Sequence, residues 1–377
     1  MHIVYLCSEY PPVPHGGIGS FVQTLARSLV KIGHRVSVVG FYAQVSDSTE
    51  DDQGVRVYRL AWRNHPLISV PENNLRLQRI LQAIHADTPI DIVEGQENAF
   101  AFFPKKTSWK KIIRMHGGHT FFATELGESF YVRKMMMEKC SFRKADSICA
   151  VSNYVSTITL KLLKLDKKVT ILPNPVDTDL FQPRPGIPEE EGCIVFVGSL
   201  CEKKGIRQLI QAMPAIVEAQ PLSHLLVVGR DVPDKKSGAS FKQRLITEIP
   251  EEIQEKISFL GIVDHDQLPE ILAKAQVCIY PSHMESMGIA WVEGLAMGKP
   301  VIASYTGPGR EIIDDGINGL LCDPFSPESI AEKTIQVLAN DVFRTMLGRK
   351  AREKAIQNYS IDSLVSQNVE FYELCMK

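Results

Sequence analysis

The chain has 377 residues, of which 44% are hydrophobic and 23% are charged. This composition is typical of a soluble globular protein and excludes an intrinsically disordered chain. The formal net charge of −2 gives no support to nucleic acid as a main partner. No stretch approaches the ~18 apolar residues of a membrane span, and the length suffices for two domains of ordinary size.

The cysteines and the first strand both favour a cytoplasmic protein. None of the eight cysteines belongs to a C-x-x-C pair, and several lie in predicted strands such as CIVFV and VCIY. We therefore expect reduced, buried thiols. The first predicted strand begins at His2, which leaves no room for a signal peptide.

Short apolar runs alternate with helical patterns through the first half of the chain. Strands are predicted at HIVYLC, RVSVVG, VRVYRL, DIVEGQ, KKIIRMHG and SICAVS, and helices at 18–32, 74–85 and 127–143. One face of the first helix carries Phe21, Leu25, Leu29 and Ile32. Strands that alternate with helices predict βαβ units and a parallel sheet that is buried on both faces.

A proline-rich, acidic segment at 174–191 interrupts this pattern and is predicted to be a linker. The alternation then resumes, with strands at CIVFVG, HLLVVG, ISFLG, VCIYPS, PVIAS and GLLC, and helical patterns from Pro327 onward. The sequence thus predicts an α/β protein with two doubly wound, Rossmann-like domains. Ligands of such sheets bind at the carboxyl ends of the strands, so two facing sheets would form a cleft.

The segment HMESMGIAWVEGLAMGKPVIA, residues 283–303, predicts a buried helix that carries two acids. On one helix, Glu285 and Glu293 would lie about 12 Å apart along the axis, with an angular offset of about 80°. The helix N-terminus is a natural seat for phosphate. A nucleotide sugar, with hydroxyls at both ends and a diphosphate between them, would fit. The alternative is one Glu that favours the helix dipole and a second that pairs with an Arg.

A glycine-containing turn, VGSLCEKKG at 197–205, follows a strong strand and opens a helix. Such a turn can cradle phosphate, and Lys204 could balance the charge of a departing diphosphate. The pattern is not a Walker loop, because G-x-x-x-x-G-K-[ST] is absent. The alternative for a lysine at a helix start is a solvated surface position.

The N-terminal loop YPPVPHGGIGS places Gly16 and Gly17 where backbone can approach a ligand at a helix N-terminus. A dinucleotide-binding fingerprint is not supported. The loop is long and proline-rich, the third glycine position is Val22, and no acidic residue ends the next strand. We therefore expect neither NAD nor FAD.

His116, in RMHGGH, follows a predicted strand and would lie at its carboxyl end. A histidine there could exchange protons near neutral pH, although a structural role is the alternative. Glu94 and Glu97 occupy a similar place after a neighbouring strand. Each could orient an acceptor hydroxyl or cap a turn.

The charged residues outside these loops are not expected to bind a metal or the donor. The DTD pattern at Asp177–Asp179 lies in the predicted linker, so we expect no metal there, and Asp177 is expected to begin a turn. The first domain is basic, which predicts either a solvated face or loose attachment to anionic lipid at the inner face of the membrane. Its basic residues include Lys105, Lys106, Lys110, Lys111, Arg114, Arg133, Lys134, Lys139 and Arg143.

The chain resembles the family 4 retaining glycosyltransferases, which have the GT-B architecture. The resemblance covers nearly the whole chain and rests on PPVPHGGIG, NPVDTDLF, VGSLCEKKG, ISFLGIV, VCIYPSHMESMGIAWVEGLAMGKPVIAS and GINGLLC, in this order. It implies an acceptor-side domain over 1–173, a hinge at 174–191, a nucleotide-sugar-binding domain over 192–358, and a helix over 359–377 that packs back on the first domain.

The resemblance also implies roles for individual residues. Glu293 would hold the ribose hydroxyls, Glu285 the hydroxyls of the donor sugar, and Lys204 the diphosphate. His116 would contact the sugar and steady developing positive charge. The remaining donor-binding positions implied are Gly17, Ser199, Gly229, Arg230, Ile262, Val263, Ser286, Met287, Gly288 and Ile289.

One position departs from the family pattern, because Ser199 stands where G-R-L usually has its arginine. Ser199 can donate a hydrogen bond to phosphate but brings no charge. Lost leaving-group stabilisation is one interpretation, and compensation by Lys204, Lys203, Arg230 or the helix terminus is the other.

The activity implied by the resemblance is transfer of a sugar from a nucleoside-diphosphate sugar to an acceptor hydroxyl, with retention and without metal or cofactor. The acceptor would be a sugar or a lipid-linked sugar, in the synthesis of cell-envelope polysaccharide, lipopolysaccharide or glycolipid. Two alternatives stay open. One is a nucleotide-sugar epimerase of the same fold, and the other is a catalytically silent protein that binds a sugar or a partner.

Overall fold

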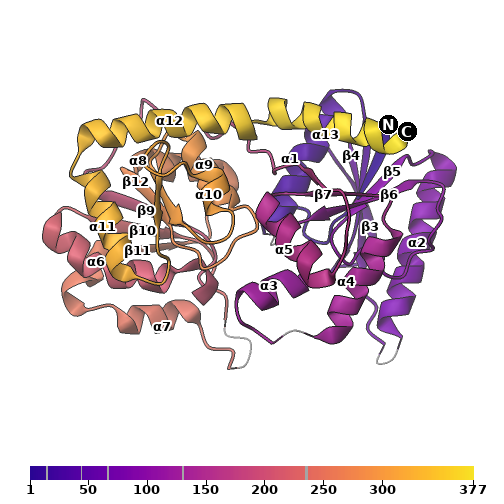
Figure 1. Ribbon diagram of the computed structural model, residues 1–377, viewed down its shortest axis with the longest axis horizontal. Coiled ribbons are helices and arrows are strands. Elements are labelled where there is room, and N and C mark those ends of the chain that lie inside the picture. The colour runs from indigo at the N-terminus through magenta and orange to yellow at the C-terminus, as the bar shows by residue number, and fades with distance from the viewer. Residues whose placement is uncertain (14–15, 44, 66–67, 130, 234–236) are drawn as a thin grey trace. The chain divides into compact units, whose positions relative to one another are not determined.

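The computed structural model describes residues 1–377 except 14–15, 44, 66–67, 130 and 234–236 (Figure 1). It divides the chain into two compact units. Unit 1 holds Met1–Pro175 together with Ile361–Lys377, and unit 2 holds Val176–Ser360. Each unit is built on a parallel or mainly parallel sheet with helices, which confirms the predicted pair of doubly wound, Rossmann-like domains.

The sheet of unit 1 has the strand order β3-β4-β2-β1-β5-β6-β7-β8. All neighbours pair in parallel except β3 and β4, which form an antiparallel hairpin at one edge. The sequence prediction misses β3 because STEDD is polar and mostly exposed. The strands are β1 (His2–Leu6), β2 (Arg35–Tyr42), β3 (Ser48–Asp52), β4 (Val55–Ala61), β5 (Ile92–Gly95), β6 (Lys110–Met115), β7 (Ser147–Ala150) and β8 (Thr170–Ile171).

The helices of unit 1 differ from the prediction in several places. The helix expected at 127–143 is present but begins at Val132, and Gly127, with φ +65°, lies before it. The helices at 119–125 and 153–163 are not predicted by the sequence pattern. Ile32 follows the first helix and is 55% exposed, so only Phe21, Leu25 and Leu29 of the predicted face are buried. The helices are α1 (Gly17–Lys31), α2 (Ser69–Asp87), α3 (His119–Glu125), α4 (Val132–Lys144), α5 (Asn153–Leu163) and α13 (Ile361–Met376).

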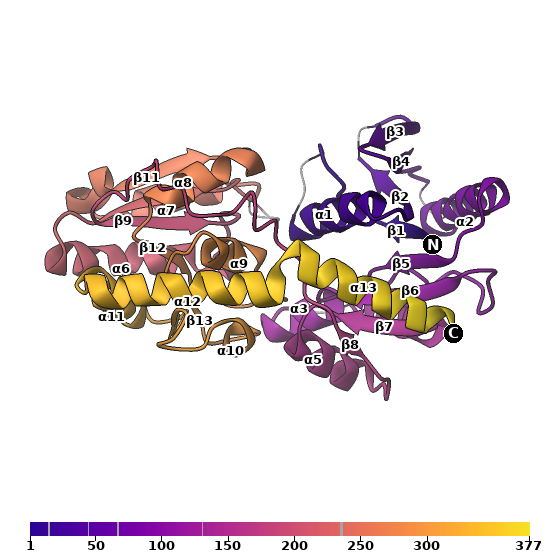
Figure 2. The same ribbon diagram turned by 90° about the horizontal axis from the view of Figure 1, so that it is seen from above.

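Helix α13 packs on the sheet of unit 1, as the resemblance implies (Figure 2). The Tyr372 hydroxyl donates to Glu94 Oε2 at 2.8 Å and also lies 2.9 Å from the Tyr5 hydroxyl. Arg114 donates to Glu94 at 2.7 Å and to Asn368 Oδ1 at 2.5 Å. These side chains are almost fully buried, so a polar network connects α13 to β1, β5 and β6.

The sheet of unit 2 is parallel throughout, with the strand order β11-β10-β9-β12-β13-β14. The order reverses between β9 and β12, and ligands of such sheets bind outside the carboxyl ends of strands at that point. The strands are β9 (Cys193–Val197), β10 (His224–Val228), β11 (Ile257–Gly261), β12 (Val277–Tyr280), β13 (Val301–Ser304) and β14 (Leu320–Cys322).

Helices cover both faces of this sheet and bury an apolar core drawn from β9, β10, α6 and α11 among others. The helices are η1 (Glu202–Lys204), α6 (Ile206–Ala219), α7 (Phe241–Glu248), η2 (Glu251–Lys256), η3 (His265–Gln267), α8 (Leu268–Lys274), α9 (Ile289–Ala296), α10 (Gly309–Ile312), α11 (Pro327–Leu338) and α12 (Asp341–Tyr359). Of the helices in the described residues, none is long and apolar enough to cross a membrane.

Most of the segment predicted as a linker, 174–191, is a folded part of unit 2. The Val176 amide donates to the Tyr359 carbonyl at 2.8 Å, and Phe181 is fully buried. Asp177 Oδ1 accepts the amide of Leu180 at 2.9 Å, so it caps a turn as the sequence predicts. This part of the chain is therefore a packed loop and not a free linker.

Candidate functional site

The loops that follow β9 and β12 bring Lys204 and Glu285 together. Lys204 ends η1, and its ammonium forms an ion pair with Glu285 Oε1. The Ser282 hydroxyl donates to the same oxygen at 2.9 Å. Burial opposes ionisation of Glu285, but the charges of Lys204 and Lys203 outweigh it and lower the pKa of this carboxyl. Glu285 is therefore a carboxylate at neutral pH and can only accept hydrogen bonds.

Glycine is needed at position 205 to place Lys204 beside Glu285. Gly205 has φ +68°, and a Cβ there would lie 1.8 Å from the carbonyl oxygen of Pro281. His283 lies in the same loop as Pro281, after β12, and its amide donates to the Lys203 carbonyl at 2.8 Å. The turn after β9 thus lies directly against the turn after β12.

Glu285 is not on a helix, which corrects the sequence prediction. Helix α9 begins only at Ile289, after Gly288 at φ +75°. A Cβ on Gly288 would lie 2.7 Å from the Trp291 ring, so glycine is required at this turn. Glu285, Ser286 and Met287 belong to the loop before α9, and the spacing calculated for one continuous helix does not apply.

Glu293 lies on α9, 6% exposed, with Oε1 at 2.8 Å from His265 Nε2. His265 belongs to η3, after β11, and its ring packs on Phe181 at 5.0 Å. Burial acts to lower the pKa of His265, but the hydrogen bond and charge of Glu293 raise it above the ordinary value. Sequence analysis misses His265, although its place two residues after ISFLGIV is a signal.

Each acid is thus paired with a basic side chain. The alternative interpretation of the sequence expected such a pairing, with an arginine, for only one of them. The bases remain open to solvent, since the side chain of Lys204 is 24% exposed and that of His265 is 42% exposed. A ligand could therefore exchange with either partner from the solvent side.

The turns after β9 and β10 touch through their backbones. Gly229 has φ +149°, and a Cβ there would lie 1.9 Å from the carbonyl oxygen of Gly198. The Leu200 amide donates to the carbonyl of Arg230 at 2.8 Å, so Ser199 and Arg230 lie on neighbouring turns. Ile262 and Val263 follow β11, and Ile262 is 78% exposed. These residues all lie at the carboxyl edge of the sheet of unit 2.

His116 lies at the carboxyl end of β6 in unit 1 and is 6% exposed. Its ring packs on Phe21 at 5.2 Å, and its amide donates to Glu97 Oε1 at 2.7 Å. Burial, and next the charge of Arg114, lower the pKa of His116 to about 3. The expectation of proton exchange near neutral pH is therefore wrong, and the ring stays neutral.

Gly17 is the first residue of α1 and is exposed. The preceding Gly16 amide donates to Glu9 Oε2 at 3.1 Å. Residues 14–15 of the same loop lie outside the described part of the chain.

A pocket of about 450 Å³ lies in unit 1, beside His116. Glu97 is one of its walls, whereas Glu94 belongs to the network around Arg114. The lining residues are Ile18, Val70, Gln96, Glu97, Asn98, His116, Gly117, Gly118, His119, Arg133, Lys134, Met137 and Glu138.

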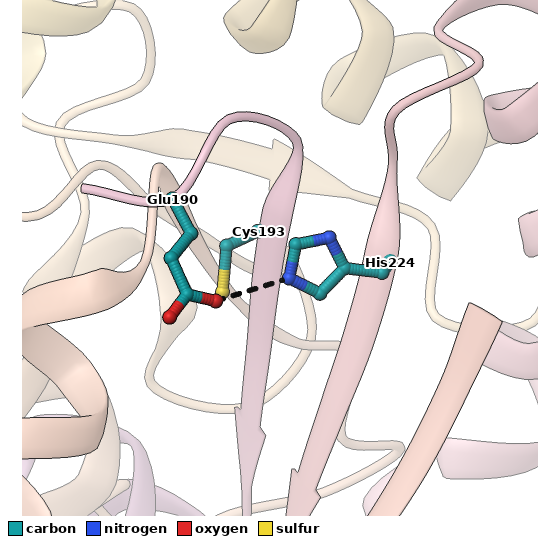
Figure 3. A group of neighbouring side chains, drawn as sticks. All are labelled: Glu190, Cys193 and His224. Atoms are coloured by element: carbon teal, nitrogen blue, oxygen red, sulfur yellow. Dashed lines mark ion pairs between the residues drawn. The ribbon is translucent and has the colours of Figure 1, made fainter.

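A mixed group of possible metal ligands lies at the opposite end of the unit 2 sheet (Figure 3). Glu190, Cys193 and His224 have ligand atoms within 4.8 Å of one another. Lys274 is also bound to Glu190, at 3.1 Å, and burial raises the pKa of the Cys193 thiol to about 12. A neighbouring ammonium and a protonated thiol both disfavour a metal ion, and Glu190 instead lies within ion-pair distance of His224 and Lys274.

Two family models match the chain, one over each half. The family model for glycosyl transferases group 1 matches residues 177–354, and that for glycosyltransferase family 4 matches residues 15–180. An uncharacterized glycosyltransferase of Methanocaldococcus jannaschii is 28% identical and aligns over 100% of this chain and 99% of its own length.

Two solved structures share the fold. Sucrose-phosphate synthase from Thermosynechococcus elongatus is 22% identical, with a TM-score of 0.84 over 99% of this chain and 98% of that one. The Anabaena protein HepE, solved in complex with UDP-glucose, is 19% identical, with a TM-score of 0.77 over 99% and 100% of the two chains.

Proposed function

Because the chain belongs to the family 4 glycosyltransferases of the GT-B architecture, we propose that it transfers a sugar from a nucleoside-diphosphate sugar to an acceptor hydroxyl, with retention at the anomeric carbon. The observation that carries the proposal is the ion pair of Lys204 with Glu285, close before the start of α9 at the switch point of the unit 2 sheet. Ligands of such sheets bind at this place.

In the proposed reaction, Lys204 turns from Glu285 to the diphosphate as the donor binds. The first amides of α9 and the positive end of its dipole face the same group. Glu285, freed from its partner and still ionised, accepts hydrogen bonds from the sugar hydroxyls. Charge on the departing diphosphate is thus balanced without a metal ion, which remains a prediction.

Glu293 is proposed to accept the ribose hydroxyls. His265 already holds Oε1 of this carboxylate, so it would orient Glu293 while the other oxygen binds the ligand. Gly229, Arg230, Ile262 and Val263 would border the ribose and base. Arg230 is exposed on the turn beside Ser199 and is our candidate for the charge that Ser199 lacks.

Substitution of Glu285 tests the proposed donor contact. Loss of one charged hydrogen bond to the sugar should lower kcat/KM of Glu285→Gln by about 10- to 100-fold. Nucleotide release is the assay, with UDP-, GDP- and ADP-sugars as donors and a sugar acceptor. The exposed Glu270→Gln serves as the control, and equal activity of both variants would refute the donor contact.

The same assay separates the alternatives. The product anomer, read by NMR, decides retention, and loss of transfer in chelator would refute metal independence. An epimerase would convert the donor sugar without an acceptor, and a silent binding protein would release no nucleotide from any donor.

The broader role proposed is the synthesis of cell-envelope polysaccharide, lipopolysaccharide or glycolipid. It is supported by the basic residues of α4, which also suggest peripheral contact with an anionic membrane. Nucleic acid is not proposed as a partner.

A further inference from the structure

We propose that the pocket of unit 1 binds the acceptor, and that this acceptor is a small polyhydroxylated molecule that carries a phosphate or carboxylate group. The inference rests on the proposed function and names the substrate class of the transferase. The lining of this pocket combines two cations that form no ion pair among the described residues with several hydrogen-bond acceptors.

The cations of the lining are Arg133 and Lys134, in the first turn of α4. Both side chains are exposed, and neither forms an ion pair with a carboxylate of the described residues. The Lys134 ammonium lies 5.4 Å from the centre of the Tyr131 ring. The N-terminus of this helix adds a positive dipole end and has no side-chain cap. An anion is the missing partner of this group.

Glu138 does not form an ion pair with Lys134. It follows Lys134 by four residues, the spacing at which a helical ion pair forms. Its side chain instead points inward, 3% exposed, with both carboxylate oxygens 3.4 Å from the Thr120 amide. The positive charge of Lys134 is therefore left facing the pocket.

The rest of the lining is suited to hydroxyl groups. Glu97 and Glu138 both lie close to Gly118, where a Cβ would be 3.1 Å from Glu97 Cβ and 2.5 Å from Glu138 Oε1. Gln96, Asn98 and the neutral ring of His116 also line the pocket. Carboxylates, amides and a neutral imidazole all bind sugar-like hydroxyls.

The size and the remaining walls agree with a small ligand. The pocket of about 450 Å³ falls in the range of ~300–1,000 Å³ found for small-molecule sites. Ile18, Val70 and Met137 offer apolar surface to the C–H face of a sugar ring. A hexose phosphate presents hydroxyls, an apolar face and an anion, which are the three features that the pocket can bind.

The test compares the full-length protein with the double variant Arg133→Gln/Lys134→Gln. Acceptors are a hexose, its 6-phosphate and the matching uronic acid, with the same phosphate head group on a lipid in micelles as a fourth arm. These arms distinguish phosphate from carboxylate and soluble from lipid-linked sources. Lys139→Gln/Arg143→Gln is the matched control, because it removes two charges from α4 outside the pocket.

We expect anionic acceptors to be used in preference to the free hexose. The double variant should raise KM for them by about 10- to 100-fold, the effect of losing a charged hydrogen bond. The control variant should leave KM for the soluble acceptors unchanged. Equal use of the free hexose, an unchanged KM in the double variant, or an equal rise in the control would each overturn the proposal.

Calorimetric binding of the anionic acceptors without donor separates this proposal from the proposed function. Binding that is lost in the double variant supports the pocket even if no donor is turned over. If donor is bound and slowly hydrolysed while no anionic acceptor binds, the pocket proposal fails and the proposed function stands.

Discussion

Glu97 and His116 are hydrogen-bonded neighbours in a buried wall of unit 1, and burial moves their pKa values in opposite directions. Burial and then the charge of Glu138 raise the pKa of Glu97 to about 7, against hydrogen bonds from its own amide and those of His116 and Gly117. The pKa of His116 falls to about 3. In both residues the low dielectric of the interior disfavours the charged form.

Replacement of Glu97 by Gln should stabilise the protein more at high pH than at low pH. Between the ordinary carboxyl pKa of 4.5 and the native pKa of about 7, native Glu97 holds a proton that the unfolded chain has lost. The free energy of unfolding of the wild type therefore falls as pH rises through this window, by up to about 3 kcal/mol for a shift of this size. The Gln side chain has no titratable group. The free energy of unfolding of the variant, relative to that of the wild type, should therefore increase from pH 5 to pH 8, as measured by urea unfolding.

His116 is present in both proteins, so its opposite slope cancels in the difference. An advantage of Glu97→Gln that is constant or shrinks as pH rises would contradict the burial of an ionisable carboxyl at this position.

The sequence predicts the places of Lys204, Glu285 and His116 because each follows a strand, and the carboxyl ends of parallel strands meet at one edge. It does not predict their partners. His265 contacts Glu293 from another loop, and Glu138 lies on α4, whose start the sequence pattern places too early. Pairing of side chains across loops depends on backbone paths that periodicity does not record.

At the scale of elements, the strands with continuous apolar runs are predicted well because they are buried on both faces. Helix boundaries are predicted less well. The pattern from Glu285 to Glu293 fits one helix, yet Gly288 adopts a left-handed conformation and α9 begins after it. Gly127 likewise has a positive φ, of +65°, and the helix expected at 127–143 begins only at Val132. Glycine permits both conformations, so the sequence leaves the choice to packing.

Gly205→Ala should disrupt the turn that holds Lys204 beside Glu285. Its φ of +68° is unfavourable for alanine, and its Cβ would overlap the Pro281 carbonyl at 1.8 Å. Gly238→Ala is the matched control, because Gly238 has φ +69° and the described residues place no atom within 4 Å of the added Cβ. The control should lose about 1 kcal/mol from backbone conformation alone.

Gly205→Ala should lose clearly more stability than that and should also weaken donor binding. Thermal unfolding and a donor titration measure the two effects. Equal losses in the two glycine variants would show that the backbone contact with Pro281 is unimportant.

At the scale of the whole molecule, unit 1 is built from two separate parts of the chain, and its polar network joins them. Tyr372 and Asn368 of α13 satisfy Glu94 and Arg114, which are 3% and 1% exposed. Buried charged groups are costly unless they are hydrogen-bonded. Helix α13 is therefore part of the fold of unit 1.

Tyr372→Phe should lower the stability of unit 1 by about 1–3 kcal/mol, since Glu94 and Tyr5 each lose a buried hydrogen bond. A chain with two units need not unfold in one step, so two signals are needed. Trp62 and Trp109 lie in unit 1 and Trp291 lies in unit 2, so the comparison is made in a Trp291→Phe background, where fluorescence reports on unit 1, while donor binding is proposed for unit 2. The fluorescence transition should shift while donor affinity is retained, and a loss of donor affinity without a fluorescence shift would contradict this assignment.

The interrupted path of unit 1 sets an order of events on the ribosome. Unit 2, from Val176 to Ser360, is translated completely before the first residue of α13 is added. Until Ile361–Met376 has emerged from the exit tunnel, a nascent chain that has formed β5 and β6 leaves Glu94 and Arg114 without two of their partners. The later-made unit can therefore finish folding first, while the earlier-made one waits for the last helix.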